Sequence, residues 1–472
     1  MEAKSETFAV KGTWVLVVED GEPVLKRDHY VRIRGNTIEA VSPDAPSATE
    51  TVIEHEQALI LPGFVNLHSH CLNGALFRGI PDDAGFEEPW LARIIYQLLL
   101  PMAEITLQTL SPEEARSIVT LGMLDIMRGG TTTLVDQWNV RQEVYFDVAE
   151  ELGIRAYGAP TIMSSSGVQI DDKGALNFEF KSNETALLDN VVAMHRRRDG
   201  SAGDRLRVML GPHAPDTCSP ELLRAIRETA NRIGCPVTIH LSQTEEEVET
   251  VFQRHGMTPV EYLSSVGLLG RDLIAAHCVR VTDRDLGLMA EADISVANCV
   301  VSFARAGVNV PYSRTAGRGI RTGIGTDSHA MALIEEMRIA GFFSKLHEGS
   351  ATAATAHELV RAATATGAAA LRRNDLGRLA PGCKADLLVI DMARPHLQPV
   401  WDPVKNLIWK GSAADITEVI VDGKVVVKNG RSTLVDEKAV MRDASAAAAK
   451  VWRIAEQRGL LSRALCAGVR QV

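Results

Sequence analysis

The distribution of hydrophobic and polar residues divides the chain into a β-rich start, a long middle part and a β-rich end. The first 60 residues contain an apolar run at 13–18 and an alternating segment at 30–41, whose central Gly35 and Asn36 are typical of a hairpin turn. From about residue 64 to 375, short apolar runs alternate with amphipathic segments of helical period. Eight runs are strand candidates: 64–68, 131–136, 155–160, 206–210, 236–241, 273–277, 294–297 and 322–327.

The segments between these runs begin with helix-start signals. Ser111 is followed by a proline and two glutamates, which is a capping box with proline at the first helical position. Ser219 starts a similar Ser-Pro-Glu sequence, and Thr282 precedes another helix. Alternating strands and helices form a parallel sheet, because a crossover helix joins neighbouring parallel strands. Eight such units over about 300 residues predict an α/β fold with a closed, TIM-like (β/α)8 barrel.

The β pattern returns after residue 376, with apolar runs at 384–392, 416–421 and 424–428, and an alanine-rich helix is expected at 444–455. Because the two β-rich ends flank the barrel in the sequence, we expect them to join into one small β-sandwich domain. The predicted boundaries are 1–60 and 376–440 for the two parts of the sandwich, 61–375 for the barrel and 441–472 for a C-terminal helical extension.

The composition is typical of a globular enzyme and narrows the range of partners. Of the 472 residues, 46% are hydrophobic and 23% are charged, and the net charge is -10. An acidic chain repels phosphate backbones, which makes nucleic acid a poor partner. The sequence shows no uninterrupted apolar stretch of membrane-spanning length, no secretion-signal pattern in its first ten residues, and seven scattered cysteines without a CxxC pair. These features predict a cytoplasmic protein that acts on a small molecule.

Four histidines and one aspartate stand at or just beyond the ends of predicted strands, and in a barrel these ends meet at the face that carries the active site. His68 and His70 point to the same side of a strand, because they are two residues apart. His240, His277 and Asp327 end the fifth, sixth and eighth runs. A carboxylate in apolar surroundings is poorly solvated unless it is paired or bound to a metal. Together these residues predict a metal site of three histidines and one aspartate, with further polar groups beside it.

Several stretches resemble the amidohydrolase superfamily, and the resemblance covers nearly the whole chain. It is strongest to the branch of cytosine, guanine and S-adenosylhomocysteine deaminases and atrazine chlorohydrolase. The matching stretches are LPGFVNLHSH, GTTTLVD, GPHAPDTCSPELL, HLSQTEEEVE, AAHCV, GIGTD and LGRLAPGCKADLLVIDM. The resemblance implies a (β/α)8 barrel with a β-sandwich made from both chain ends. It also implies that His68, His70, His240 and Asp327 bind the metal and that His277 is catalytic.

These implied roles agree with the local chemistry. A divalent ion with an open coordination position lowers the pKa of bound water to near 7. Asp327 can accept a proton from that water, and His277 can stabilise the charge that develops on the substrate. Binuclear relatives carry a modified lysine at the fourth strand, but the stretch MLGPHAPD contains none, which favours one ion. Zinc is the first expectation and iron the alternative, because both suit these ligands. Related enzymes are often dimers or larger.

One position departs from the family pattern. Deaminases of this branch place a glutamate three residues after the histidine of the fifth strand, where this chain has Gln243. An amide can hydrogen-bond a ring nitrogen, but it cannot deliver a proton by ordinary acid–base chemistry. Gln243 is therefore a candidate catalytic residue, and Glu245 or His329 are candidates to replace the missing acid.

Gln243 leaves more than one chemistry open. The first alternative is hydrolytic deamination of a nitrogen heterocycle, which is favoured by the number of such relatives. The second is hydrolytic dechlorination or a similar displacement on a heteroaromatic ring, because such a leaving group needs no proton. A catalytically silent scaffold is the third, and the complete ligand set argues against it, since a silent protein has no reason to keep a costly buried polar site.

Loops beyond the strands supply candidate substrate contacts. Trp90, Gln137 and Trp138 follow the first two barrel runs and can stack on or hydrogen-bond a planar molecule. A segment with Ser302, Phe303 and Arg305 replaces the Ser-Asn-rich turn that binds substrate in relatives. The candidate substrate-binding residues are His213, Trp90, Gln137, Ser302, Phe303 and His329.

Overall fold

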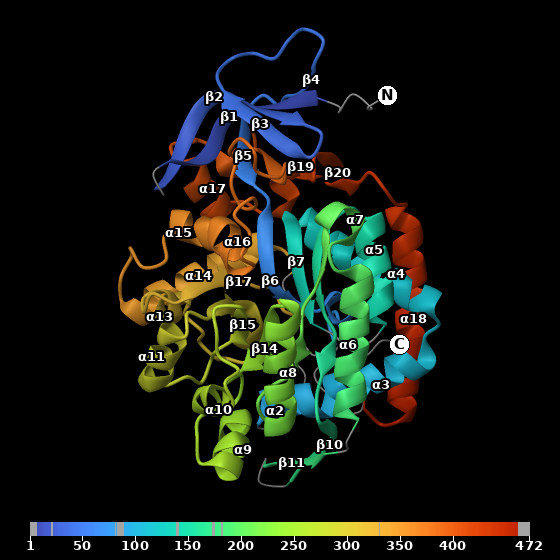
Figure 1. Ribbon diagram of the computed structural model, residues 1–472. Helices are drawn as coiled ribbons and strands as arrows, with labels where there is room; N and C mark the ends of the chain where they lie inside the picture. The colour runs from blue at the N-terminus through green and yellow to red at the C-terminus, as the bar shows by residue number, and fades with distance from the viewer. Residues whose placement is uncertain are drawn as a thin grey trace.

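The computed structural model describes residues 7–19, 22–80, 82, 89–137, 141–171, 175–180, 183–329 and 331–460. They form an α/β fold in which short parallel strands alternate with helices (Figure 1). Each of the eight predicted runs overlaps a strand. The strands are β6 (Phe64–Ser69), β7 (Thr131–Gln137), β8 (Arg155–Ala159), β12 (Leu206–Val208), β14 (Val237–Leu241), β15 (Leu273–His277), β16 (Ser295–Asn298) and β17 (Arg321–Ile324).

These strands form two parallel sheets. One has the order β12-β8-β7-β6 and the other the order β14-β15-β16-β17. Parallel bridges between Ser69 and Asp327 and between Leu210 and Val237 join the sheets at both edges. Short strands β9 (Thr161–Ile162) and β13 (Gly211–Pro212) extend β8 and β12 as a separate parallel pair. The bridge at Asp327 therefore brings the end of the first strand beside the loop that follows the last.

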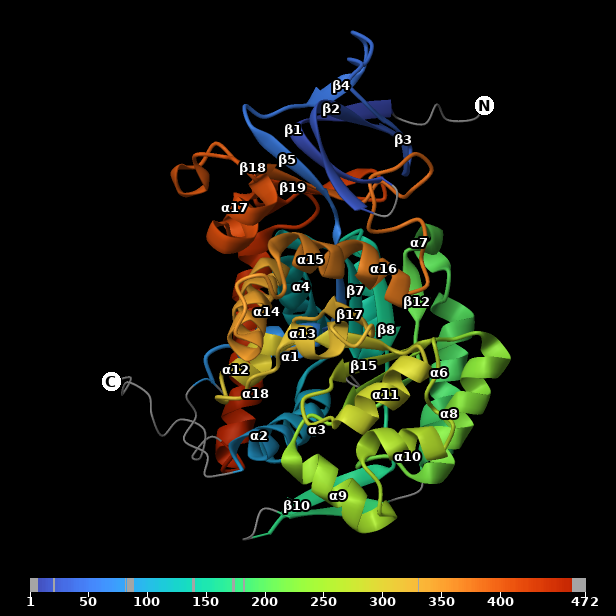
Figure 2. The ribbon, with the colours of Figure 1, turned by 90° about the vertical axis from the view of Figure 1, so that its left-hand side faces the viewer.

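Strands from both ends of the chain pair in one nine-stranded sheet, which lies at one end of the molecule (Figures 1 and 2). Its order is β21-β20-β19-β18-β5-β1-β2-β3, and β4 pairs with β1. The antiparallel contact between β5 and β18 joins the two halves. Its strands are β1 (Thr7–Glu19), β2 (Glu22–Arg34), β3 (Thr37–Ser42), β4 (Thr51–Ile53), β5 (Ala58–Pro62), β18 (Leu387–Asp391), β19 (Ile416–Val421), β20 (Lys424–Lys428) and β21 (Arg431–Ser432).

The predicted helix starts are confirmed. The hydroxyl of Ser111 accepts the backbone N–H of Glu114 in a complete capping box, and Thr282 caps its helix in the same way. Ser219 accepts from the N–H of Leu222. The α-helices include α4 (Pro112–Arg128), α5 (Gln142–Glu151), α6 (Glu184–Arg198), α8 (Pro220–Ile233), α9 (Glu245–His255), α10 (Pro259–Ser265), α11 (Asp283–Glu291), α14 (Leu333–Glu348), α17 (Pro403–Lys410) and α18 (Glu437–Gln457).

The helix expected at 444–455 is the central part of α18, which is longer at its N-terminal end and packs along α4 (Figure 1). The remaining helical segments, most of them short, complete the described part of the chain. They are α1 (Cys71–Leu76), α2 (Trp90–Arg93), η1 (Ile94–Leu99), α3 (Leu100–Thr109), α7 (Ser201–Asp204), α12 (Val300–Ala304), α13 (Tyr312–Ala316), α15 (Ala356–Arg361), η2 (Ala362–Thr366), α16 (Gly367–Ala370), η3 (Pro395–Leu397) and η4 (Ala413–Asp415).

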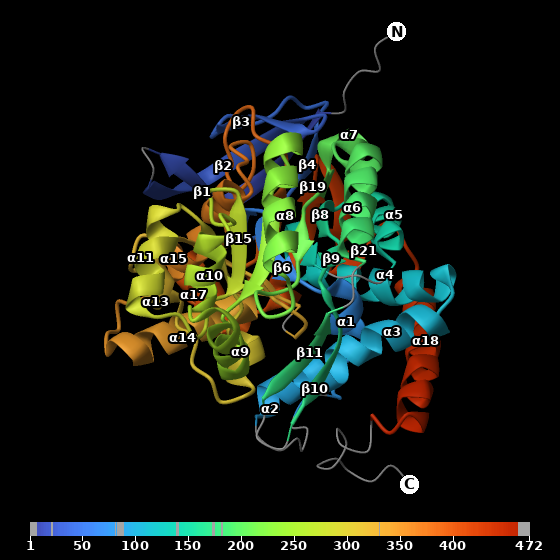
Figure 3. The ribbon, with the colours of Figure 1, turned by 60° about the horizontal axis from the view of Figure 1, so that its bottom comes forward.

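Two features near the ends of the parallel strands were not predicted. A hairpin of β10 (Ser165–Ile170) and β11 (Leu176–Phe180) lies beside the helical stretch that contains α2 and α3 (Figure 3). The stretch Trp90–Thr109 is helical and, by length and composition alone, apolar enough to cross a membrane. Arg93 and Glu104 interrupt its apolar residues, so an uninterrupted run was not seen in the sequence. Of its most apolar window, 44% is buried inside the protein.

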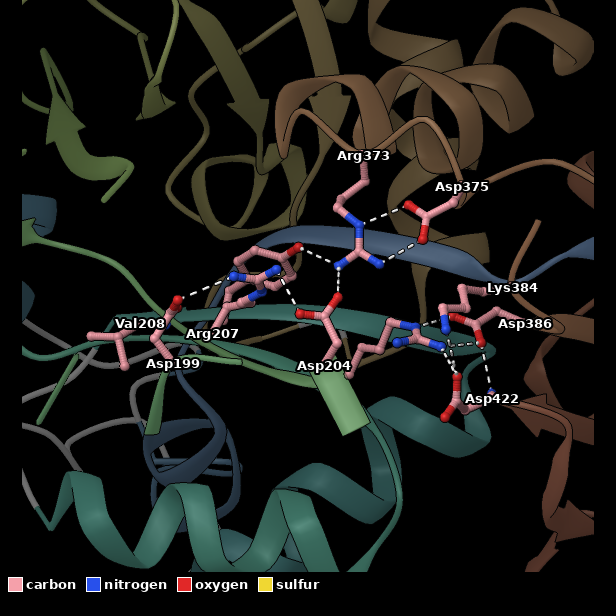
Figure 4. A network of polar contacts seen from close by, with 11 residues as sticks. Asp199, Asp204, Arg207, Val208, Arg373, Asp375, Lys384, Asp386 and Asp422 are labelled. Atoms are coloured by element: carbon pink, nitrogen blue, oxygen red, sulfur yellow. Dashed lines mark hydrogen bonds and ion pairs between the residues drawn. The ribbon is translucent and has the colours of Figure 1, made fainter. Parts of the chain in front are cut away.

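A network of buried ion pairs fastens β8 to the terminal sheet (Figure 4). The guanidinium group of Arg155 is fully buried and donates to Asp386 at 2.6 and 3.1 Å and to Asp422 at 2.5 Å. Asp386 precedes β18, and Asp422 lies in the turn between β19 and β20. The carboxylates of both aspartates thus come from the C-terminal β region and pair with a residue of the parallel sheets.

Candidate active site

Three histidine side chains converge at the carboxyl ends of the parallel strands. His68 is in β6, His70 follows that strand, and His240 is in β14. One ring nitrogen from each lies within 4.8 Å of the others, and all three residues are buried. These three residues were predicted from the sequence as metal ligands. They lie in one cluster, although their strands belong to two different sheets.

Backbone carbonyl groups orient two of these rings. The Nδ1 atom of His70 hydrogen-bonds the carbonyl oxygen of Gln137, and Nδ1 of His240 lies 2.7 Å from the carbonyl oxygen of His213. The Nε2 atoms of His70 and His240 consequently face each other at 3.4 Å. Fixing one ring nitrogen in this way selects the other for a metal.

His68 is the residue whose surroundings fit a metal ion best. Both of its ring nitrogens are buried and have no hydrogen-bond partner among the residues that the structure describes. The rings of His70, His240 and His277 surround it edge-on, at centroid distances of 4.8, 4.9 and 5.0 Å. Burial lowers the pKa of His68 and of His240 well below the ordinary value, so both rings are neutral. A neutral imidazole is the form that binds a metal, and an ion bound here would give the buried nitrogen the partner it lacks.

Asp327 completes the cluster from the loop after β17. Its Oδ1 lies 3.4 Å from Nε2 of His70. Burial by itself would raise the pKa of Asp327, but His70, His277 and His68 together hold it well below its usual range. The carboxylate is therefore ionised, as a metal ligand or a proton acceptor must be.

Several of these strand ends have a strained backbone. His277 has a φ of 77° and Asp327 a φ of 53°, and Ser242 and Cys278 have φ values of 51° and 52°. Residues other than glycine seldom adopt such conformations, which cost about 1–3 kcal/mol each and cluster at functional sites. The fold thus maintains a costly geometry at the same end of β14, β15 and β17.

A cavity lies next to the histidine cluster. Its lining includes the polar residues His70, His213, His240, His277 and Asp327 and the apolar residues Leu91, Ile94, Ile95, Leu99 and Leu100. The apolar wall comes from α2, η1 and the start of α3, a segment whose contribution the sequence analysis missed. The remaining lining residues are Asn73, Gln243, Ser302, Phe303, Arg305, Ser328 and His329.

Residues that line the cavity carry polar atoms without a hydrogen-bond partner in the described part of the chain. They are Oδ1 of Asn73, Nε2 of Gln243, Nδ1 of His277 and Oγ of Ser302, all of them buried. Phe303 packs edge-on against His277, with the ring centroids 4.9 Å apart. Buried polar atoms are normally hydrogen-bonded, so this arrangement suits a flat molecule that presents hydrogen-bonding groups at its edge.

The other residues predicted to contact the substrate are not among those that line this cavity in the described part of the chain. Gln137 is fully buried and its side chain donates to the carbonyl oxygen of Pro212 at 2.8 Å, so it supports β13 and is not among the cavity-lining residues. The Trp90 ring is half-buried and lies 5.8 Å from the guanidinium carbon of Arg305. Trp138 lies outside the described residues.

The two residues that were considered as replacements for the missing acid differ in position. His329 lines the cavity, with its Nδ1 2.7 Å from Nη1 of Arg305, and burial together with Arg305 lowers the pKa of His329 to about 4. Glu245 is in the first turn of α9, where its side chain is 73% exposed and pairs with Arg280. Glu245 is thus a surface residue, whereas His329 faces the site.

His213 and His277 are both neutral in their buried positions. Burial, with a smaller contribution from the nearby His70, lowers the pKa of each to about 4, although Asp327 partly opposes this shift at His277. Nδ1 of His213 lies 3.0 Å from the hydroxyl oxygen of Thr217, and its ring is tilted against His240 at 4.9 Å. Both rings are therefore available for hydrogen bonds to a bound molecule.

Comparison with known proteins identifies the family. The model of the amidohydrolase family matches residues 59–426. The chain belongs to the amidohydrolase family. It is 35% identical over 440 residues to a 5'-deoxyadenosine deaminase of Methanothermobacter thermautotrophicus, with 91% of this chain and 94% of that protein covered. It is 33% identical over 426 residues to a 5-methylthioadenosine/S-adenosylhomocysteine deaminase of Thermococcus sibiricus, with 89% and 94% covered.

A solved structure resembles the fold of this amidohydrolase. An adenosine deaminase from Xanthomonas campestris with bound zinc superposes with a TM-score of 0.82 at 24% identity, and the match covers 94% of this chain and 98% of that one. At this identity the likeness concerns the fold. The superposed protein holds zinc, and the histidine cluster of this chain is a group that could hold a metal ion.

The sequence analysis of this amidohydrolase assigned no role to Asp136, the next-to-last residue of β7. Its Oδ2 accepts the N–H of Cys71 at 2.6 Å and the hydroxyl of Ser69 at 3.4 Å, and the residue is 2% exposed. Burial raises its pKa. Asp136 thus contacts both neighbours of His70, the side chain of Ser69 and the backbone of Cys71. An aspartate at the end of an apolar strand, as at Asp327, was the signal that could have identified it.

Proposed function

We propose that this amidohydrolase is a zinc-dependent aminohydrolase that removes the amino group from the adenine ring of a 5'-modified adenosine. The observation that carries the proposal is the buried cluster of His68, His70 and His240, in which both ring nitrogens of His68 lack a hydrogen-bond partner within the described ranges. The two deaminases of adenosine derivatives, each matched over about nine-tenths of this chain, support the substrate class.

The proposed architecture follows the family. We infer that the two parallel sheets, bridged at both edges, close as a TIM-like (β/α)8 barrel. The nine-stranded sheet is then the β-sandwich domain formed by 1–60 and 376–440, with the barrel at 61–375 and the helical extension at 441–472. In such barrels the loops after the strands hold the active site, which agrees with the position of the cavity.

Four residues are proposed to hold one ion: His68, His70, His240 and Asp327. Zinc bound to such nitrogen and oxygen ligands supplies the Lewis acidity that makes water nucleophilic near neutral pH. The ionised Asp327 carboxylate is the proposed acceptor of the proton that water loses. His277, held neutral by burial, is proposed to donate a hydrogen bond where negative charge develops on the ring.

Other cavity residues are proposed to orient the ring. The Gln243 side chain can hydrogen-bond a ring nitrogen, and His213 and Ser302 can bond further edge atoms. Phe303 and the apolar wall of η1 exclude water and cover the flat face of the ring. His329 lines the same cavity and is the remaining candidate for a relay, but its pKa of about 4 leaves it neutral near pH 7, so it would first have to take up the proton that water releases before passing it to the departing amine.

Hydrolytic dechlorination remains the second candidate, because Gln243 stands where deaminases of this branch have an acid, and chloride leaves without a proton. The purified zinc enzyme should be offered 5'-deoxyadenosine, S-adenosylhomocysteine, guanine and a chlorotriazine, with ammonia and chloride measured separately. Ammonia from the nucleosides supports the proposal. Chloride release without ammonia would overturn it in favour of dechlorination. If no substrate yields either product, the catalytically silent scaffold is the better explanation.

The proposed function needs a small-molecule substrate and requires neither nucleic acid nor a membrane as a partner. Cytoplasmic location and a homodimer or larger homo-oligomer stay predictions from the sequence.

A further inference from the structure

A buried glutamate holds the backbone of the loop that carries Gln243. Glu247 belongs to the first turn of α9 and is fully buried. Its Oε1 accepts the backbone N–H of Ser242 at 2.7 Å, and its Oε2 accepts the backbone N–H of Gln243 at 2.8 Å. The carboxylate therefore binds two successive peptide groups of the strand end with its two oxygens.

This loop needs such support because its backbone is strained. Ser242 has a φ of 51°, a left-handed conformation that few residues other than glycine adopt. Its carbonyl oxygen accepts the N–H of Arg280 at 2.8 Å, which fixes the loop from the side of β15. Glu247 fixes it from the other side. With both peptide groups held, the Cα of Gln243 has little freedom, and its side chain is directed to the cavity that it lines.

Keeping a glutamate in this position is costly for the protein. Burial raises the pKa of Glu247 well above the ordinary value, and the neighbouring Asp216 carboxyl raises it further, while the backbone N–H groups of Gln243 and Ser242 and the nearby Gln243 side chain lower it. Asp216 is also fully buried and accepts the hydroxyl of Tyr96, a residue of η1, at 2.5 Å. Two buried carboxyl groups behind the loop are expensive, and helix α9 is already capped by Thr244, whose side chain accepts the N–H of Glu247. Helix capping therefore does not explain the Glu247 carboxylate.

We propose that Glu247 is a positioning residue that acts through Gln243: its carboxylate sets the place from which the Gln243 amide meets the substrate ring. The proposal rests on the proposed function, because it assumes that Gln243 contacts the reacting heterocycle. A displacement of about 1 Å at such a contact can cost about 100-fold in rate. The effect of altering Glu247 should then depend on whether Gln243 is present.

The test is a double-mutant cycle on the zinc-loaded enzyme, with ammonia release from 5'-deoxyadenosine as the readout. Glu247→Gln keeps the size of the side chain but offers an NH2 group to one of the two backbone N–H donors. We expect kcat to fall about 100-fold with KM changed less than about threefold, and Glu247→Asp to recover part of the loss. In the Gln243→Ala background, Glu247→Gln should cost less than about threefold more. The matched control is Glu249→Gln, an exposed residue of the same helix.

The melting temperature of every variant is recorded, because a structural role alone would lower stability and leave kcat of the folded enzyme unchanged. That result would overturn the proposal, as would an equal loss of kcat with and without Gln243. Amide hydrogen exchange in the wild-type protein gives an answer without any activity: the N–H groups of Ser242 and Gln243 should exchange as slowly as those of β14. Fast exchange there would overturn the proposal even if the Glu247 variants do not fold. Slow exchange in an enzyme that releases no ammonia would instead refute the proposed function.

Discussion

Nε2 of His70 lies 3.4 Å from Oδ1 of Asp327, across the edge where β6 and the loop after β17 are bridged. The two residues lie in segments far apart in the sequence, at opposite ends of the series of parallel strands. Their proximity places the ionised Asp327 carboxylate next to the His68–His70 pair. A metal centre at this place thus depends on the meeting of the first and the last strand.

Loss of His68 should remove the metal. We expect His68→Asn to reduce bound zinc from about one ion per chain to less than about a tenth and to lower kcat at least 1,000-fold, because the ring lies at the centre of the cluster. Zinc content by elemental analysis and ammonia release measure the two effects. His347→Asn, on the exposed side of α14, is the control and should keep both. A fully loaded and active His68→Asn enzyme would contradict the metal assignment.

Restoring an acid at position 243 should improve deamination. A glutamate can donate a proton to a ring nitrogen and to the leaving amine, which the amide of Gln243 cannot do. We therefore expect Gln243→Glu to raise kcat/KM for ammonia release about 10- to 100-fold, whereas Gln243→Leu, of similar size and without polar atoms, should lower it. If Gln243→Glu brings no gain while the wild-type enzyme deaminates efficiently, another group supplies the proton, and His329 is the first to test.

The buried ion pairs of Arg155 should be important for stability. Arg155→Met leaves the carboxylates of Asp386 and Asp422 without their buried cation, and we expect the free energy of unfolding to fall by about 3–5 kcal/mol. Urea unfolding measures this loss. Arg116→Met removes a partner from a half-exposed ion pair with Glu151 and should cost less than about 1 kcal/mol. Equal losses for the two variants would mean that burial of the Arg155 network adds no stability.

Stability should fall as the pH rises from about 4 to 6, in part because of Asp216. Burial raises the pKa of Asp216 to about 6, above its ordinary value of 3.8, although Tyr96 and Arg254 partly oppose the rise. Between these values the folded protein keeps a proton that the unfolded chain has lost, so the free energy of unfolding decreases with pH, and it is constant above the folded-state pKa.

The side chain of the Asp216→Asn variant cannot ionise, so its free energy of unfolding should vary less with pH. The change between pH 4 and pH 7 should differ between the wild-type protein and the variant by up to about 3 kcal/mol. Urea unfolding at a series of pH values from 4 to 7 measures it. Asp125→Asn, at a half-exposed ion pair with Arg78, is the comparison. Parallel profiles for wild-type protein and Asp216→Asn would show that Asp216 does not hold the extra proton.

Local patterns of the sequence were sufficient to predict the elements that carry the site. Apolar runs predicted each of the eight parallel strands, and the Ser111, Ser219 and Thr282 caps predicted helix starts, because period and capping depend on residues close together in the chain. The strand-end positions of His68, His70, His240 and His277 could be read for the same reason. The candidate metal ligands were thus recognisable from residue type and position along the chain.

Contacts between distant segments were decided by the tertiary structure. The apolar wall from α2 and η1, the carbonyl of Gln137 that orients His70, and the Glu247 carboxylate behind Gln243 depend on how whole strands and helices pack. Glu245 and Glu247 show why: both stand in the same first turn of α9, but helical geometry directs one to solvent and the other into the protein. The sequence by itself determined which residue types stand at the strand ends. The packing of the chain decided which atoms face the cavity, because burial and direction are set by neighbours that no local pattern specifies.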